Sequence, residues 1–183
     1  MKFSSRHERK LWLLASLVVL AIVVSLFINR ELISFFEDQN IQAIIFVLVM
    51  VLIGIALMIN AIRTKPTIPE IALWLGIAAV YIMLFLRLGL AERSHLMEYS
   101  ILAMLVHRAL IERRNNGRRI TNPAFVAFGI SFGIGLLDEC IQLFLPHRVF
   151  DWYDIVFNGI VVAGALLLLV VFQWIRKRKT SGN

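Results

Sequence analysis

Long stretches without a charged side chain constrain the fold of this chain more than any other feature. They cover residues 11–29, 41–62, 71–86, 123–137 and 161–175. A helix that crosses a membrane needs about 20 mostly apolar residues, and a soluble core does not need so many apolar runs in succession. The hydrophobic share of 60% also exceeds the roughly 45–50% of ordinary soluble domains. The sequence therefore predicts an all-α, polytopic membrane protein.

We predict a single transmembrane domain over residues 1–183, with six spans in a helix bundle. The spans are expected at about 11–28, 41–62, 70–89, 95–112, 123–145 and 152–175. Pro69-Glu70 and Asn122-Pro123 are typical of helix starts. Proline fits the first turn of a helix, and a polar neighbour can accept hydrogen bonds from the backbone N–H groups of that turn. The first apolar run is longer than the core of about 7–15 residues in a signal peptide, so we expect it to remain in the protein.

The distribution of basic residues predicts the orientation in the membrane. With six spans, fourteen of the nineteen Lys and Arg residues fall on the side of both termini and four on the opposite side. Cytoplasmic loops carry such a basic excess, so we expect both termini in the cytoplasm. The net charge of +7 then reflects topology and contact with anionic lipids, and it does not indicate nucleic-acid binding.

One segment near the carboxyl-terminal end is polar where its surroundings are apolar. It reads LLDECIQLFLPHRVFDWYDIVFNG and covers residues 136–159. Its polar side chains include Asp138, Glu139, Gln142, Arg148, Asp151, Asp154 and Asn158. A stripe of His95, Glu98 and Tyr99 on another expected helix reaches the same depth, about 6–12 Å below the outer surface by helix rise. Polar groups from three helices therefore converge in one layer.

The free-energy cost of exposing charged side chains to lipid determines which way this layer faces. An ionised side chain deep in a bilayer costs at least about 2.5–3.5 kcal/mol, so several together must face the bundle interior or a wet cavity. We expect a polar pocket that is open to the outside. A buried polar network that only stabilises the bundle is the structural alternative, and Asp151 and Asp154 could also serve only to begin a helix.

Two segments resemble the VanZ-like membrane proteins. They read HLMEYSILAMLVHRAL (95–110) and DECIQLFLPHRVFDWYDIVFNGIVVAG (138–164). The first resembles the H-x-x-E-Y segment of that family, and the second resembles its D-E-x-x-Q-x-F-x-P-x-R segment followed by D-x-x-x-N. The resemblance covers residues 90–180 and implies a role for the residues at the motif positions. These are Glu98, Asp138, Glu139, Gln142, Arg148, Asp154 and Asn158.

The resemblance also implies a location and a kind of partner. VanZ-like proteins are multi-pass proteins of the bacterial inner membrane, and the family is named for a protein that confers resistance to the glycopeptide teicoplanin. We therefore expect a membrane lipid, a lipid-linked envelope molecule or a lipoglycopeptide as the partner. Whether the protein forms a homodimer is left open. The resemblance supplies no reaction.

We interpret the polar residues as a site for an amphiphilic envelope component at the outer leaflet. The candidate catalytic acids or bases are Glu98, Asp138 and Glu139. The candidate substrate-binding residues are His95, Gln142, Arg148, Asp154 and Asn158. Arg148 can hold a phosphate or carboxylate through its planar donor fork. No residue stands out as a nucleophile, so the residues leave open whether the site binds or catalyses.

Two other functions stay open beside this interpretation. A small transporter could use the acids as a proton or cation site, and a scaffold could use them to lock the bundle. The oxygen ligands of this set suit Mg²⁺ or Ca²⁺ better than zinc, but no diagnostic spacing assigns a metal or another cofactor. The sequence contains no glycine-rich phosphate loop, CxxC pair or HExxH motif.

Overall fold

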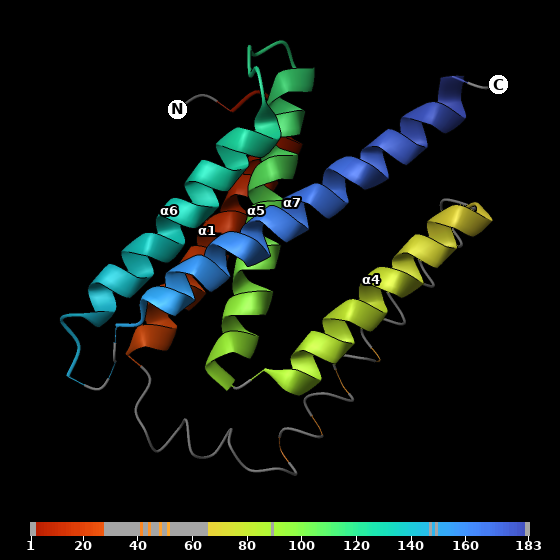
Figure 1. The fold of residues 1–183 in the computed structure, drawn as a ribbon. Helices are drawn as coiled ribbons and strands as arrows, with labels where there is room; N and C mark the ends of the chain where they lie inside the picture. The colour runs from red at the N-terminus through yellow and green to blue at the C-terminus, as the bar shows by residue number, and fades with distance from the viewer. Residues whose placement is uncertain are drawn as a thin grey trace. The chain divides into compact units, whose positions relative to one another are not determined.

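The computed structural model describes residues 3–27, 66–88, 90–146, 148 and 150–181, with single helical positions at 41, 44, 48 and 51. Within these residues the chain forms helices and no strand, which confirms the predicted all-α fold for this part of the protein (Figure 1). The helices are α1 (Arg6–Leu26), α4 (Ile68–Arg87), α5 (Leu90–Asn115), α6 (Pro123–Gln142) and α7 (Trp152–Ser181). Most of the helix predicted at 41–62 lies outside the described residues, and the four of its positions that are described are helical.

The chain divides into two compact units, residues 1–27 with 91–183 and residues 28–90. The second unit contributes α4 to the described residues, close to the helix predicted at 70–89. The carboxylate of Glu70 accepts a hydrogen bond from the backbone N–H of Thr67 at 2.7 Å. This hydrogen bond caps the first turn of α4, which explains why the helix begins just before the predicted position.

Polar caps also set the starts of α1 and α6. The hydroxyl of Ser5 accepts a hydrogen bond from the backbone N–H of Glu8 at 3.0 Å. The side chain of Asn122 accepts one from the backbone N–H of Phe125 at 3.2 Å, and Pro123 follows at the first helical position. Because the first N–H groups of a helix have no partner within it, such caps fix where each helix begins.

The connection between α5 and α6 depends on a glycine. Gly117 has a φ of 85°, a left-handed conformation that suits a residue without a Cβ atom. Its backbone N–H donates to the carbonyl of Arg114 at 3.1 Å, and that of Arg118 donates to Arg113 at 3.3 Å. These bonds satisfy the last carbonyls of α5 and turn the chain back toward α6.

α6 ends earlier than the sequence predicts. The predicted helix reached residue 145, but α6 stops at Gln142. The N–H groups of Phe144 and Leu145 bond three residues back, to Ile141 and Gln142, at 3.0 and 3.1 Å. This tighter turn ends the helix before Pro146, so the following segment can fold toward the start of α7.

In the unit of residues 1–27 and 91–183, α6 lies beside both α1 and α7 (Figure 1). α5 supplies more buried hydrophobic side chains than any other helix among the described residues. These are Leu96, Tyr99, Leu102, Ala103, Val106, Ala109 and Leu110. Their spacing of three and four places one continuous stripe of α5 in the core.

The outer faces of α1, α6 and α7 are apolar. Large exposed hydrophobic residues include Leu13, Leu17 and Leu20 on α1, Phe125 and Leu137 on α6, and Ile160 and Leu167 on α7. A soluble protein rarely exposes a surface of this kind. Within the described residues, three helices are long and apolar enough to cross a membrane, namely Arg6–Leu26, Pro123–Gln142 and Trp152–Ile175. The chain is therefore a membrane protein.

The number of such helices differs from the predicted six. The described residues supply three, and α4 adds a shorter apolar helix at Ile68–Leu84. α5 is not among these helices, because it carries charged residues such as Glu92, Glu98 and Arg108 outside its buried apolar stripe. Its burial comes from packing against other helices and not from a uniformly apolar sequence.

Candidate functional site

A set of polar side chains, all of them buried except the half-buried His95, lies where α5, α6 and α7 meet, and we call this set the polar cluster. It consists of His95 and Tyr99 on α5, Asp138, Glu139 and Gln142 on α6, and Asn158 on α7. Tyr99, Glu139 and Asn158 are fully buried, and Asp138 and Gln142 are only 5% and 6% exposed. Buried polar groups at this density need partners, because an unpaired one is costly.

The buried face of α6 explains how the polar cluster closes. Gly135 lies one turn before Asp138 and Glu139 on this face. A Cβ atom at Gly135 would lie 3.2 Å from the ring of Tyr99 and 3.4 Å from the side chain of Asn158. The glycine therefore lets α6 approach α5 and α7 together, which brings the polar groups of all three helices within hydrogen-bond distance.

Three hydrogen bonds hold the polar cluster. The hydroxyl of Tyr99 donates to Oδ2 of Asp138 at 2.9 Å, which joins α5 to α6. Nδ1 of His95 lies 3.0 Å from the side-chain oxygen of Asn158, which joins α5 to α7. Within α6, the side-chain amide of Gln142 donates to Oε1 of Glu139 at 2.9 Å.

Some polar atoms of the cluster are left over after these bonds. Oδ1 of Asp138, Oε2 of Glu139 and Nδ2 of Asn158 are buried without a hydrogen-bond partner among the described protein atoms. The backbone of Asp151 also approaches the carboxylate of Glu139. An unsatisfied buried donor or acceptor costs about 1–3 kcal/mol, and more when it is charged. The cluster therefore has the capacity to bind a further polar or charged group.

The remaining predicted site residues lie around the polar cluster. Glu98 is half-buried, and it is close enough to interact electrostatically with Asp138 and Arg148. Asp154 is half-buried too and interacts electrostatically with His95. Glu98, Arg148 and Asp154 thus form an outer layer around the cluster and not part of its hydrogen-bonded core.

Arg148 has a partner that the sequence did not indicate. Its guanidinium donates to the backbone carbonyl of Ser25 at 2.7 Å, near the carboxyl-terminal end of α1. A cation at this end of a helix satisfies a free carbonyl and interacts favourably with the helix dipole. A guanidinium has five N–H donors, so Arg148 can anchor α1 and still offer donors to a ligand.

Tyr99 is the residue of the cluster that was missing from the predicted site. The sequence placed it on one stripe with His95 and Glu98 but gave it no role in the site. The structure makes it the link between α5 and Asp138. Its spacing of four from His95 was the available signal, because residues four apart share one face of a helix; the two rings pack edge to face at 5.7 Å.

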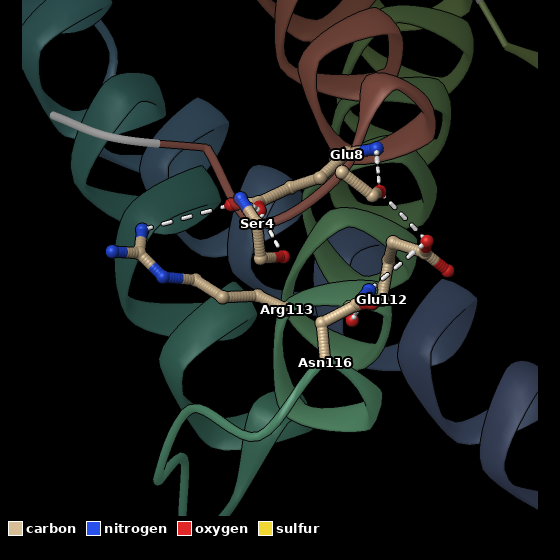
Figure 2. A network of polar contacts seen from close by, with 6 residues as sticks. Ser4, Glu8, Glu112, Arg113 and Asn116 are labelled. Atoms are coloured by element: carbon tan, nitrogen blue, oxygen red, sulfur yellow. Dashed lines mark hydrogen bonds and ion pairs between the residues drawn. The ribbon is translucent and has the colours of Figure 1, made fainter.

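A second polar network lies at the start of α1 and the end of α5, away from the cluster (Figure 2). The fully buried carboxylate of Glu8 accepts hydrogen bonds from the N–H of Ser4 at 2.6 Å and from its hydroxyl at 2.5 Å. Arg113 on α5 pairs with the same carboxylate at 3.7 Å. Ser5 donates to Glu112 at 2.8 Å. This cap was not predicted from the sequence, although the S-x-x-E spacing of Ser5 and Glu8 is a signal for it, and no local signal points to a partner on α5.

Apolar helices that enclose a set of ionisable side chains define the class of protein: a helical membrane protein with a polar site inside its bundle. The model of the VanZ/LLP1 family matches residues 11–176, and the chain belongs to this family. The match starts well before the segments that carry the sequence resemblance, so it includes the amino-terminal half. No curated protein and no solved structure shows a significant match to the chain.

Proposed function

We propose that this protein binds the polar headgroup of an amphiphilic cell-envelope component in the polar cluster. The observation that carries the proposal is the pair of buried carboxylate oxygens, on Asp138 and Glu139, that have no hydrogen-bond partner among the described residues. They lie among helices whose outer faces are apolar. A ligand with a polar head and an acyl chain would match this arrangement, because its head can reach the carboxylates while its chain stays in the bilayer. A small soluble metabolite would not need a site beside apolar helix faces.

The proposed site faces the extracytoplasmic side of the bacterial inner membrane, and the chain crosses that membrane six times with both termini in the cytoplasm. The basic residues support this orientation, since fourteen of nineteen fall on the side of the termini. In this arrangement α5 is the fourth span. Its composition is tolerated because its polar residues pack in the bundle and at its ends, not against lipid.

The headgroup is proposed to be anionic or phosphorylated, with Arg148 as its first contact. A guanidinium binds phosphate or carboxylate oxygens through two parallel N–H groups. The carbonyl of Ser25 fixes the position of this side chain near Glu98 and Asp138. Lipoglycopeptides and lipid-linked envelope precursors both carry a polar head on an apolar chain, and they are the substrate classes for which we propose the site.

Glu98, Asp138 and Glu139 are the groups that could transfer a proton if the bound headgroup reacts. A carboxylate beside other carboxylates can exchange a proton with a ligand at little cost. Among the residues of the cluster, no serine or cysteine is available as a nucleophile. The proposal is therefore binding first, with acid–base chemistry as the reaction class that the same side chains support.

Native mass spectrometry of the purified full-length protein tests the proposal. We expect the wild type to retain an envelope lipid, and we expect Arg148→Ala and Glu139→Gln to lose it. Glu8→Gln makes the same chemical change in a buried carboxylate that lies outside the cluster, so this control should keep the lipid. Thermal unfolding of each variant separates loss of ligand from loss of fold. Lipid retained equally by all variants would show that the cluster is only a scaffold.

A further inference from the structure

We propose that the polar cluster is a binding site for a divalent transition-metal cation, with His95, Asp138 and Glu139 as its protein ligands. One nitrogen or oxygen atom of each residue lies within 4.8 Å of the other two. A cation bound at about 2.0–2.2 Å from each atom would hold any two of them no more than about 4.4 Å apart. Small side-chain movements are sufficient to close this difference.

The hydrogen bond of His95 prepares its other ring nitrogen for a metal. The side-chain oxygen of Asn158 can only accept a hydrogen bond, so Nδ1 of His95 carries the proton in this contact. The lone pair of the neutral ring is then on Nε2. Metal-binding histidines are commonly oriented in this way, with one ring nitrogen donating to an oxygen and the other bound to the ion.

The two carboxylates follow the same pattern. Tyr99 holds one oxygen of Asp138, and the other is buried without a hydrogen-bond partner among the described residues. Gln142 holds one oxygen of Glu139, and in the described part of the chain only the backbone of Asp151 approaches this carboxylate besides. Each of the three candidate ligands thus has one atom fixed by a neighbour and one atom left for an ion. A polar network that only stabilises the bundle would be expected to satisfy both atoms.

Charge balance favours a divalent ion. Two carboxylates, 5% and 0% exposed, sit inside a bundle of mostly apolar helices. The effective penalty for an unpaired buried charge is several kcal/mol. A cation of charge +2 would neutralise both carboxylates at once. Protonation of both carboxyl groups is the competing solution, and it would leave the cluster without affinity for metal.

The donor atoms favour a transition metal over Mg²⁺ or Ca²⁺. The oxygen donors alone would suit a hard cation, and the sequence assigned no metal to them, but His95 adds an imidazole nitrogen to the set. Imidazole suits zinc and similar metals, whereas Mg²⁺ and Ca²⁺ prefer ligand sets made of oxygen. Three protein ligands with a further open position are also typical of zinc in catalytic sites. We therefore take Zn²⁺ as the expected ion, with Mn²⁺ and Mg²⁺ as weaker-binding comparisons.

The metal would share its site with the proposed headgroup. A bound cation could contact a phosphate or carboxylate oxygen of the head, and this part of the inference rests on the proposed function. Binding of the ion itself does not rest on it. A metal-bound head would also explain how an anionic ligand could approach two carboxylates.

Metal binding is measured on the full-length protein in detergent, after removal of bound metals with a chelator. The protein is equilibrated with Zn²⁺, Mn²⁺ or Mg²⁺ and passed over a desalting column, and the metal is counted by inductively coupled plasma mass spectrometry. We expect about one Zn²⁺ per chain in the wild type and little Mg²⁺. His95→Gln and Asp138→Asn should lose the zinc. His7→Ala removes an exposed histidine of α1 and should keep it.

A variant outside the ligand set still tests the inference if a ligand variant does not fold. Asn158→Ala removes the acceptor of His95 and should lower zinc affinity about 10–100-fold while Zn²⁺ still binds at saturation. Equal zinc content in the wild type and in folded His95→Gln overturns the inference. If the protein retains lipid but binds no zinc, the metal site is refuted and the proposed function stands. If it binds zinc but retains no lipid, the proposed function is refuted and the metal site stands.

Discussion

The hydroxyl of Tyr99 on α5 donates a hydrogen bond to Asp138 on α6 at 2.9 Å, across 39 positions of the chain. Both side chains are buried, so neither can replace the partner with bulk water. The bond therefore ties α5 to α6 and also sets the direction of the Asp138 carboxylate.

Tyr99→Phe tests this link. The change keeps the ring in the core but leaves Oδ2 of Asp138 without its donor, so we expect the protein to lose about 1–3 kcal/mol of stability. The loss should appear as a lower midpoint of thermal unfolding in detergent. Tyr153→Phe removes a hydroxyl from an exposed ring on α7 and should leave the midpoint unchanged. An unchanged midpoint in Tyr99→Phe would mean that Asp138 does not depend on this hydroxyl.

Gly135→Ala tests the close approach of α6 to its neighbours. The added methyl group would lie 3.2 Å from the ring of Tyr99, so we expect destabilisation of about 1–3 kcal/mol and weaker ligand binding. Gly129→Ala is the matched control on the same helix, because an added Cβ atom there meets no other atom within 4 Å. Alanine has the higher helix propensity, so the control should be neutral or slightly more stable. Equal behaviour of the two variants would contradict the packing argument.

The network around Glu8 predicts coupling between the two ends that it joins. Glu8→Ala and Arg113→Ala should each destabilise the protein, because the buried carboxylate and its 3.7 Å ion pair connect α1 to α5. The double variant should lose less than the sum of the single losses, with a coupling free energy of about 0.5–3 kcal/mol. Chemical unfolding of the four proteins measures this quantity. Additive losses would indicate that the pair contributes nothing beyond its separate residues.

The proposed orientation predicts the accessibility of two exposed positions. In a protein whose Cys140 has been replaced, a cysteine at Asn116 should resist an impermeant thiol reagent in intact cells. A cysteine at Phe150 should react, because the loop before α7 would face the outside. Both cysteines should react after the membrane is opened. The opposite labelling in intact cells would invert the topology and place the polar cluster on the cytoplasmic side.

The sequence indicated the polar cluster for a reason that does not need a structure. Ionisable residues such as Asp138 and Glu139 interrupt an apolar run, and the cost of exposing them to lipid leaves only the bundle interior. Helical spacing then placed Gln142 on the same face. Five of the eight predicted site residues belong to the hydrogen-bonded core of the cluster for these reasons.

Contacts that depend on tertiary packing could not be predicted from the sequence. Arg148 bonds to a backbone carbonyl 123 positions away, and a backbone group carries no identity that a sequence pattern could reveal. Ser5 and Glu112 bond through their side chains across 107 positions, and no local pattern shows that the two helix ends meet. The end of α6 at Gln142 was missed because apolar residues continue beyond it, and only the turn at Phe144 stops the helix.

The composition of α5 has a consequence for how the protein is made. A ribosome delivers α5 to the insertion machinery before α6 and α7 have been synthesised. Charged and polar residues in this helix oppose partition into lipid on its own, whereas α1 is apolar enough to insert without help. We therefore expect α5 to wait at the translocation channel until its neighbours emerge. In a nascent chain stalled once α5 has left the ribosome, a cysteine in α5 would then react with a water-soluble thiol reagent, whereas it would be protected in a chain stalled once α7 has emerged.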